Sequence, residues 1–582
     1  MNSPSSHKSY RPVTVLSLRV GYYIADLVDM NGLFIQRLLN IILHAVLVQM
    51  VARLYACLFK RSTCTSTYQH TLETTLVKVL FMLHPTHIES VVNIANRAHL
   101  LSLLFCLMAC DLEMSAVLVG FVYLLGLLSC ETAVFLFPAV CFTWVYIDFC
   151  KFDNDGDGGD GGDDGDKEED AKDGDKKEDD KEDADRHADD NTHDDNADKE
   201  EQVGDLYKIK HCIQKRLPRL VLITIITFHY LYTRHRLDWI HIPPELIRPA
   251  ENPFYTFDGM NRVWNYALVL SIHVVKSLGM GLVDLVGFSH EYGFDCVRRI
   301  ESLQDGRLWI PVLLVVFVLY LLFECCQGRD NKRFNGKGFV LFLTFSAWMA
   351  SLFPVSGFIR VGTFIADRIV TASTVPSAIL WTRILSPHLR AAGSRKSSTV
   401  MKYSMLVLLS AFLWIKVQRR SAEWMAPKSL LESSLRACPR SAKSHLEMSK
   451  VYSSGLFDTP IDLDKTSHHL ETAQEIDADF CDLHYQFALL YFKQNKFLEF
   501  EERVTLGVLC QFTMQGAHSL FQQYWSHVLN DPMQLANGAK ERYTVQINII
   551  QDAIQREKEM MSKKESGEDG EGIAIDIANE EL

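Results

Sequence analysis

The sequence lacks several features that mark common classes of protein. It contains no glycine-rich loop of the kind that binds nucleotide phosphates, and no basic face of the kind that binds nucleic acid. Residues 1–12 are polar and show no signal-peptide pattern. These absences argue against a nucleotide-dependent enzyme and against a nucleic-acid partner.

The cysteines do not form a metal-binding pattern either. The 14 cysteines are scattered, and no C-x-x-C pair has a second pair at zinc-finger spacing. Most of them, such as Cys106 and Cys141, lie in apolar runs, where cysteine acts as a small hydrophobic residue. His84 and His87 have an H-x-x-H spacing, but no further ligand set accompanies them. We therefore expect no metal and no cofactor.

Negative charge is concentrated in one stretch of the chain. Residues 153–201 contain 25 acidic and 7 basic side chains, whereas the whole chain has a net charge of −13. The remainder of the chain is therefore slightly basic. Glycine, aspartate, glutamate and lysine cannot bury enough apolar surface to offset chain entropy, so we expect residues 151–207 to form a disordered loop.

Long apolar runs dominate the rest of the first 420 residues. A helix needs about 20 mostly apolar residues to cross a bilayer. The stretch 262–283 is also apolar, but Arg262, His273 and Lys276 favour a helix that lies in the membrane interface. The sequence therefore predicts an all-α protein with a polytopic membrane domain of about ten spans. The candidate spans are 37–59, 72–92, 97–112, 115–129, 132–149, 217–234, 308–325, 338–354, 375–389 and 401–417.

The distribution of lysine and arginine predicts the orientation of these spans. Cytoplasmic loops are enriched in both residues. With ten spans and 262–283 lying flat, four basic clusters fall on the same side as the acidic loop. The N-terminus, the loop 235–307 and everything after residue 417 then fall on the opposite side. The four clusters lie at 60–61, 208–219, 329–337 and 390–402.

From residue 428 onward the pattern changes to amphipathic helices of modest length. A tetratricopeptide unit consists of two antiparallel helices in about 34 residues. Residues 481–507 fit this pattern, with Phe487 and Ala488 on the first helix and Phe500 and Val504 on the second. A preceding unit spans 442–473, and 539–560 is expected to be a closing helix. An ordinary helical bundle is the alternative.

Two polar segments lie next to apolar spans, where ionisable groups are costly and are candidates for function. The first contains HPTHIE at 84–89 and NRAH at 96–99; its candidate substrate-binding residues are His84, His87, Glu89 and Arg97. Arginine is the natural bidentate partner of a phosphate. The alternative for this segment is a polar cap between two spans.

The second polar segment runs from FPVSG at 353–357 to Asp367 and Arg368. Both charged residues are candidates for substrate binding. A local ion pair between Asp367 and Arg368 is the alternative. Under the predicted orientation, both polar segments lie on the side away from the acidic loop.

In this order, these elements resemble the transmembrane and tetratricopeptide-repeat O-mannosyltransferases, a family of C-type glycosyltransferases. The resemblance implies an enzyme of the endoplasmic-reticulum membrane. Such an enzyme takes mannose from dolichyl phosphate mannose, a lipid-linked substrate, and places it on Ser or Thr of secretory-pathway proteins. It also implies that the repeats lie in the lumen and engage the acceptor, while the acidic loop is cytosolic. The matching stretches are SHKSYRPVTVL at 6–16, LNIILH at 39–44, HPTHIE at 84–89, NPF at 252–254, FPVS at 353–356 and the repeats after Pro439.

The chain departs from the family pattern near its beginning. In this family another span precedes the stretch at 6–16, and a luminal loop between them carries acidic residues close to the catalytic centre. We therefore assign no catalytic residue, and we expect a longer transcript that encodes the upstream span and the acidic motif. A homologue that binds without catalysing is the alternative. NRAH at 96–99 also stands where the family tends to have Gly-Arg-Ala-Asp.

Three functions remain open from the sequence. The leading one is a mannosyltransferase with its centre between 84–97 and 353–368; the second is an inactive homologue that acts as a luminal adaptor for client proteins. A transporter ranks last because no inverted repeat with paired broken helices is visible. The expected division of the chain is 1–150 and 208–420 for the two membrane blocks, 151–207 for the acidic loop, 421–560 for the repeats and 561–582 for a polar tail.

Overall fold

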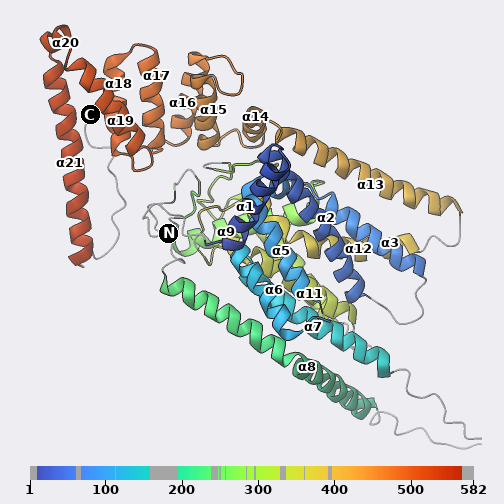
Figure 1. Cartoon of the computed structure of the whole chain (residues 1–582). Coiled ribbons are helices and arrows are strands. Elements are labelled where there is room, and N and C mark those ends of the chain that lie inside the picture. The colour runs from blue at the N-terminus through green and yellow to red at the C-terminus, as the bar shows by residue number, and fades with distance from the viewer. Residues whose placement is uncertain are drawn as a thin grey trace, which may run out of the picture.

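In the part of the chain that the structure describes, the regular secondary structure is helical, apart from one isolated bridge between Met280 and Val283. In this computed structural model, the helices up to residue 423 form one block, and the C-terminal helices project from one end of it (Figure 1). The predicted all-α fold class is confirmed. The described residues are 10–566, with gaps at 60–66, 112, 157–193, 238–246, 248–250, 256, 284, 294–295, 328–335, 360 and 391–395.

The first part of the block follows the predicted apolar runs closely. The predicted span 72–92 is not one helix, because the chain turns at Pro85, which separates α3 from the short α4. Asn31 caps α2 by accepting hydrogen bonds from the amides of Leu33 and Phe34. The helices are α1 (Pro12–Leu27), α2 (Gly32–Leu58), α3 (Thr67–Met82), α4 (His87–Val92), α5 (Arg97–Ala109), α6 (Ala116–Ser129) and α7 (Ala133–Gly156).

The second part of the block consists of helices α8 to α13. Helices α7 and α8 extend into both ends of the stretch predicted to be disordered. Lysine and glutamate at 199–201 are good helix formers and favour the start of α8. Residues 157–193 of that stretch lie outside the described residues. The helices are α8 (Asp194–Arg236), α9 (Gly259–Gly279), α10 (Trp309–Gln327), α11 (Gly336–Leu352), α12 (Thr374–Arg390) and α13 (Lys396–Glu423), with short 3-10 turns η4 (Phe353–Val355) and η5 (Asp367–Thr371).

Large aromatic side chains fill the core of the block. Tyr55, Phe81, Tyr123 and Trp144 are completely buried and come from α2, α3, α6 and α7. The indole of Trp144 donates a hydrogen bond of 2.9 Å to the carbonyl of Ala109 at the end of α5. Buried indoles need such a partner. These contacts hold the first helices in one fixed arrangement.

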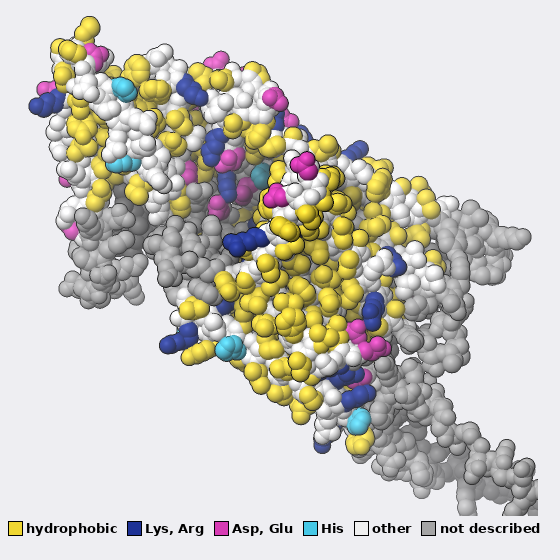
Figure 2. Space-filling view, in the orientation of Figure 1, with side chains coloured by type: hydrophobic (Ala, Val, Ile, Leu, Met, Phe, Trp, Pro, Cys, Tyr) yellow, Lys and Arg dark blue, Asp and Glu magenta, His cyan; other side chains and the backbone are white. Residues whose placement is uncertain are grey.

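The outer surface of the block is apolar. Figure 2 shows a broad hydrophobic face where α1, α6 and α8 lie, with charged side chains gathered at its margins. Contiguous exposed apolar surface on this scale is typical of membrane contact. Exposed apolar residues of α1, α6 and α8 include Leu16, Phe121, Val221 and Phe228.

One helix among the described residues, α2, is long and apolar enough by itself to cross a membrane. Shorter apolar helices cover Ile94–Ala109, Ala116–Ser129, Ala133–Phe149 and Gly306–Tyr320. The count of about ten spans therefore stays a prediction, as does the orientation of the chain.

The C-terminal helices form the predicted repeat pairs. Phe487 and Ala488 lie on α17, Phe500 and Val504 lie on α18, and all four are buried where the helices pack. Gly455, with φ of 62°, ends α15 in the left-handed conformation that favours glycine. The helices are α14 (Pro427–Ala437), α15 (Ala442–Ser454), α16 (Leu463–Ile476), α17 (Asp482–Lys493), α18 (Phe497–Leu509), α19 (Met514–Val528), α20 (Pro532–Ala536) and α21 (Ala539–Ser566).

A buried carboxylate makes the stability of the repeat domain depend on pH. Burial, assisted by the charge of Asp479, raises the pKa of Asp477 from 3.8 to about 6. The folded state therefore holds this proton more tightly than the unfolded state. Ionising Asp477 in the folded state therefore lowers the free energy of unfolding. This loss is absent below about pH 4, grows between about pH 4 and 6, and is complete above about pH 6.

Asp477→Asn should therefore stabilise the protein by about 1–3 kcal/mol at pH 7.5 and have little effect at pH 4. Denaturant midpoints of the purified full-length variant at the two pH values measure this difference. Asp464→Asn, at an exposed position of α16, is the control and should change neither value. An equal effect of Asp477→Asn at both pH values would contradict the assignment.

Candidate functional site

The two histidines of the segment 84–89 lie inside the block. The Nε2 atom of His84 lies 3.1 Å from the carbonyl oxygen of Ser277 at the end of α9. His87 lies between two side chains, with Nδ1 2.9 Å from Nε2 of His44 and Nε2 2.8 Å from Oγ1 of Thr374. Both rings are 2% exposed. They tie the turn before α4 to α2, α9 and α12.

Arg97 is also buried, at 1% exposure, and its guanidinium is bound within the protein. It donates to Oδ1 of Asn40 at 2.6 Å and to the carbonyl oxygens of Ser17 and Gln36 at 3.1 and 2.8 Å. Asn40 in turn donates to the carbonyl of Val91. In this structure Arg97 therefore holds α5 against α1 and α2.

Glu89 and Arg368 bring the two polar segments together, although they are 279 positions apart in the sequence. The guanidinium of Arg368 lies 2.5 Å from the Glu89 carboxylate, and the backbone N–H of Arg368 donates to the same carboxylate at 3.0 Å. Glu89 is buried, whereas the side chain of Arg368 is 25% exposed. Arg368 is thus the accessible member of this pair and retains the geometry that binds phosphate or sugar oxygens.

Asp367 directly precedes Arg368 in the sequence and is completely buried. Its carboxylate accepts a hydrogen bond of 2.7 Å from the Tyr292 hydroxyl. Two buried cations also face it, with Nζ of Lys276 at 3.4 Å and Nη2 of Arg420 at 3.3 Å. These partners come from the loop after α9, from α9 itself and from the end of α13. Asp367 therefore joins the candidate site to the helix that leads into the repeat domain.

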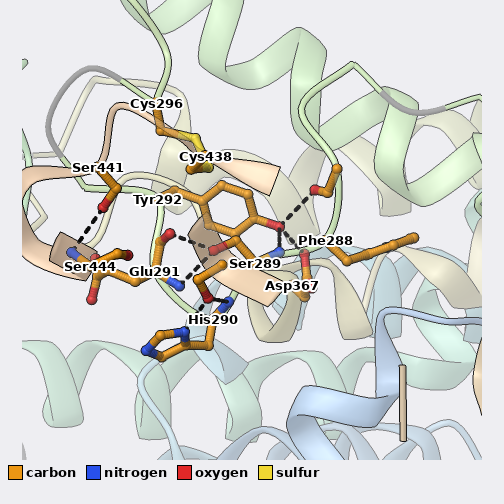
Figure 3. The surroundings of a disulfide bond; sticks show 12 residues. Phe288, Ser289, His290, Glu291, Tyr292, Cys296, Asp367, Cys438, Ser441 and Ser444 are labelled. Atoms are coloured by element: carbon orange, nitrogen blue, oxygen red, sulfur yellow. Dashed lines mark hydrogen bonds between the residues drawn. A yellow bond between two sulfur atoms is a disulfide. The ribbon is translucent and has the colours of Figure 1, made fainter. Parts of the chain in front are cut away.

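A disulfide fixes the same loop to the repeat domain. Cys296 is bonded to Cys438, which directly follows α14, across 142 positions of sequence (Figure 3). A second disulfide joins Cys481 and Cys510 at the two ends of the pair α17 and α18. Disulfides persist in oxidising compartments. The free cysteines among the described residues all lie in the helical block: Cys57, Cys106, Cys110, Cys130, Cys141 and Cys212.

Polar contacts reinforce this junction. His290 is hydrogen-bonded to the Ser434 hydroxyl on α14. Burial, with the charges of Arg420 and Lys443, lowers the pKa of His290 to about 4, so its ring is neutral at neutral pH. Lys443 on α15 forms ion pairs of 3.0 Å with Glu291 and 2.8 Å with Glu251. Burial opposes the charge of Lys443, but the two carboxylates outweigh it and raise its pKa.

The inner face of the repeats is hollowed. A cavity of about 350 Å³ lies between α15, α17 and the start of α19. It begins beside the junction, because Lys443 both lines the cavity and binds the loop after α9. The remaining lining combines aromatic rings with amides and charges, including Glu447, Lys450, Phe480, Tyr485, Gln486, Phe512 and Gln515.

A second charged cluster lies around Glu131, between α6 and α7. Its two carboxylate oxygens lie 2.9 Å from Arg11 and 2.9 Å from Arg234. His99 is close enough to feel the charges of Arg11 and Glu131 in this cluster and of Glu89 and Arg368 in the first. The two clusters are therefore neighbours.

The structure thus brings together Glu89, Asp367 and Arg368 of the six predicted site residues, while His84, His87 and Arg97 bind within the helical core. Sequence reasoning did not assign Tyr292 or Arg420 to the site. Lys276 carried a signal, since a lysine in an apolar helix needs a buried partner. Nothing local in the sequence identified Asp367 as that partner.

The described residues contain one cluster of potential metal-ligating atoms, formed by Cys481, Asp482 and Cys510. Its two sulfur atoms are bonded to each other. A disulfide sulfur is not the thiolate that binds a metal. This cluster is therefore part of the repeat framework.

Known proteins that are similar to most of this chain are named protein O-mannosyl-transferases. The chain is 24% identical over 459 residues to the protein O-mannosyl-transferase TMTC4 of Mus musculus, covering 77% of this chain and 56% of the relative. It is 23% identical over 468 residues to the protein O-mannosyl-transferase F38B6.6 of Caenorhabditis elegans, covering 78% and 52%. The chain is a divergent homologue of these O-mannosyl-transferases. The resemblance predicted from the sequence is confirmed.

A shorter stretch is more similar to the family. Over 109 residues, 19% of this chain and 10% of the relative, it is 37% identical to the protein O-mannosyl-transferase TMTC3 of Homo sapiens. The chain spans about half the length of the curated O-mannosyl-transferases that it matches over most of its own length. No family model and no solved structure matches it.

Proposed function

We propose that this chain is a protein O-mannosyltransferase that transfers mannose from dolichyl phosphate mannose to Ser or Thr of secretory-pathway proteins. The observation that carries the proposal is the ion pair between Glu89 and Arg368, which joins the two polar segments that begin with the motifs HPTHIE and FPVS, both of which resemble the O-mannosyltransferase family. Of the six candidate residues, Glu89 and Arg368 are the ones that we propose to contact substrate. Asp367, His84, His87 and Arg97 would position them.

Arg368 would bind the phosphate that leaves when the sugar is transferred. The reaction places negative charge on that phosphate, and a fixed guanidinium stabilises such charge where water is partly excluded. The Glu89 carboxylate orients Arg368, because it accepts hydrogen bonds from both the guanidinium and the backbone N–H of Arg368. The pair therefore provides a preorganised cation at the surface of the site.

The cavity on the inner face of the repeats is the proposed acceptor site. Aromatic rings such as Tyr485 and amides such as Gln486 suit an extended peptide, because they contact both its side chains and its backbone. The junction at Lys443 places one end of this cavity beside the loop that carries Tyr292. A bound peptide would thus be held close to the transfer site.

We also propose that the repeats lie in the lumen of the endoplasmic reticulum and that the acidic loop is cytosolic. The two disulfides support this orientation, because both join segments after residue 235 that the basic clusters place away from the cytoplasm. The free cysteines lie in the helical block. A glycosylation sequon engineered into an exposed turn of the repeats should be modified, whereas one in the acidic loop should not.

Arg368→Gln should lower mannose transfer at least about 100-fold, since it removes the proposed phosphate partner. The assay uses the purified full-length chain in lipid nanodiscs with dolichyl phosphate mannose and a Ser/Thr peptide, and mass spectrometry counts the added hexoses. Arg556→Gln, at an exposed position of α21, is the matched control and should transfer normally. Arg368→Lys should recover part of the activity, because it keeps the charge but loses the bidentate geometry. An active protein that is unaffected by Arg368→Gln would contradict the assignment.

A second candidate function is a luminal adaptor that binds client proteins without glycosylating them. It is favoured by the pairing of the carboxylates, since Glu89, Glu131 and Asp367 are each bound to arginine or lysine. A hydroxyl that attacks a sugar needs a carboxylate to take its proton. Client capture that is lost in Tyr485→Ala, together with no measurable mannose transfer by the wild-type chain, would establish this alternative.

A further inference from the structure

Three histidines of the helix pair α15 and α16 have no role in the candidate site. His445 lies on α15, and His468 and His469 lie on α16, which packs against α15 (Figure 1). The Nδ1 atoms of His445 and His469 are 3.0 Å apart, although the two residues are separated by 24 positions. His445 is only 8% exposed. Packing of the two helices therefore directs two ring nitrogens of the same kind at one point.

The contacts of His445 determine which of its nitrogens carries the proton. Nε2 of His445 lies 3.0 Å from the carbonyl oxygen of Pro439, which can only accept, so Nε2 is the protonated atom. Burial lowers the pKa of His445 and, with the neighbouring histidines, lowers that of His469 to about 4. Both rings are neutral at neutral pH, the form that binds a metal. Nδ1 of His445 thus presents a lone pair to His469, with its ring held by a carbonyl as metal-ligating histidines usually are.

Two such nitrogen atoms can share either a proton or a metal ion. A proton on Nδ1 of His469 would give an N–H···N hydrogen bond at the observed 3.0 Å. A Zn²⁺ ion bound tetrahedrally to both atoms, at about 2.0–2.1 Å, would place them about 3.3 Å apart. The proton of His469 would then move to Nε2 of the same ring. A shift of about 0.3 Å therefore converts the pair into two ligands of one metal ion.

His468 can supply a third nitrogen. Its ring centroid lies 5.7 Å from that of His469, and its side chain is exposed. The three rings are not yet a ligand cluster, but another staggered rotamer of His468 can turn a nitrogen toward the pair. The nearby positive charge is balanced, because Lys465, which lies over the Tyr452 ring, forms an ion pair of 2.9 Å with Asp462. The surroundings thus admit a cation.

We propose that His445, His468 and His469 form a binding site for Zn²⁺ that links α15 to α16, with water as the fourth ligand. Three imidazoles with an open fourth position suit Zn²⁺, whereas Ca²⁺ and Mg²⁺ prefer oxygen ligands. Positions 445, 468 and 469 match no zinc-finger spacing, which is why the sequence indicated no metal here. The site is independent of the proposed transferase function and holds whether or not mannose is transferred.

Calorimetric titration of the purified, tag-free full-length chain with zinc chloride, after removal of metals with a chelator, tests this site. His445→Gln and His469→Gln should each weaken Zn²⁺ binding at least about tenfold, since even the loss of a residue that supports a ligand costs about 10–100-fold. His468→Gln should weaken it severalfold, because two ligands remain. His527→Gln, at an exposed position of α19, is the control and should bind as the wild type does. The acidic stretch 153–201 is the same in every variant, so any zinc that it binds cancels in the comparison.

Melting temperatures with and without Zn²⁺ separate a metal site from a hydrogen-bonded histidine pair. Zn²⁺ should raise the melting temperature of the wild type, since a ligand that binds the folded state stabilises it, and should leave His469→Gln unchanged. A wild-type chain without tight Zn²⁺ binding would overturn the site, and so would stabilisation by Zn²⁺ that persists in His469→Gln. His468→Gln replaces an exposed side chain and decides the matter if the other two variants do not fold. Zn²⁺ affinity equal to that of the wild type would then count against the proposal.

Discussion

Asp367→Asn should destabilise the protein by about 3–5 kcal/mol, the cost of breaking a buried ion pair from one side. The carboxylate is completely buried and faces Lys276 and Arg420, which are 1% and 3% exposed. Without its charge, both cations remain in the core with too little negative charge to balance them. The denaturant midpoint of the purified full-length variant measures the loss.

Two comparisons distinguish this effect from a general cost of substitution. Asp552→Asn, at an exposed position of α21, should leave the midpoint unchanged. A double variant that combines Asp367→Asn with Arg420→Gln should cost less than the sum of the single variants, because the second change removes one stranded charge. Strict additivity would show that Asp367 and Arg420 do not interact.

Asp367→Asn should also disturb the candidate site, because it can shift the backbone of η5. Asp367 precedes Arg368 within η5, and the N–H of Arg368 donates directly to Glu89. Movement of η5 would misplace the guanidinium even though Arg368 itself is unchanged. We expect Asp367→Asn to reduce mannose transfer at temperatures where the variant is still folded, with a smaller effect on peptide affinity. Equal losses in both would indicate simple unfolding.

The helices were predictable because their signal is local. A run of apolar residues marks a membrane-type helix wherever it stands, and each of the ten candidate stretches overlaps a helix of the structure. Proline at 85 marks its turn for an equally local reason. The repeat pairs followed from the spacing of buried residues such as Phe487 and Phe500.

The site was only partly predictable because its contacts connect distant segments. The sequence left a local ion pair between Asp367 and Arg368 open, yet each is paired elsewhere, Arg368 with Glu89 and Asp367 with Lys276 and Arg420. Charges at membrane depth indicate that a partner exists, but not which one. The position of Arg97 shows the same limit, since its bonds to Asn40 and to two carbonyls depend on how three helices pack.

In helix α9, tertiary contacts provide partners for charged side chains that the sequence suggested would reach water. Arg262 and Lys276 favoured a helix lying in the membrane interface, where both side chains would reach water. In the structure Arg262 donates to the carbonyl of Gly357 and Lys276 faces Asp367. The charges are thus accounted for within the protein. Whether α9 lies flat stays a prediction.

Replacing Cys296 and Cys438 together by serine should loosen the attachment of the repeats and destabilise the protein by about 2–5 kcal/mol. This disulfide connects positions 142 residues apart and joins the loop after α9 to the end of α14. The ion pairs of Lys443 and the bond between His290 and Ser434 remain, but they are exposed to exchange with water once the covalent link is lost. Hydrogen exchange should therefore accelerate in α14, in α15 and in residues 285–293.

The second disulfide provides the matched control. Serine at both Cys481 and Cys510 removes a bond between positions only 29 residues apart, within one helix pair. Its cost should be about 1 kcal/mol smaller, since the entropy of closing a loop rises with its length. Exchange should then accelerate in α17 and α18 and stay unchanged in α14. If removal of the bond between Cys296 and Cys438 leaves exchange in α14 unchanged, the polar contacts alone hold the repeats beside the site. The cavity and Arg368 would then keep their spacing without a covalent link, and acceptor affinity should not depend on the redox state of the protein.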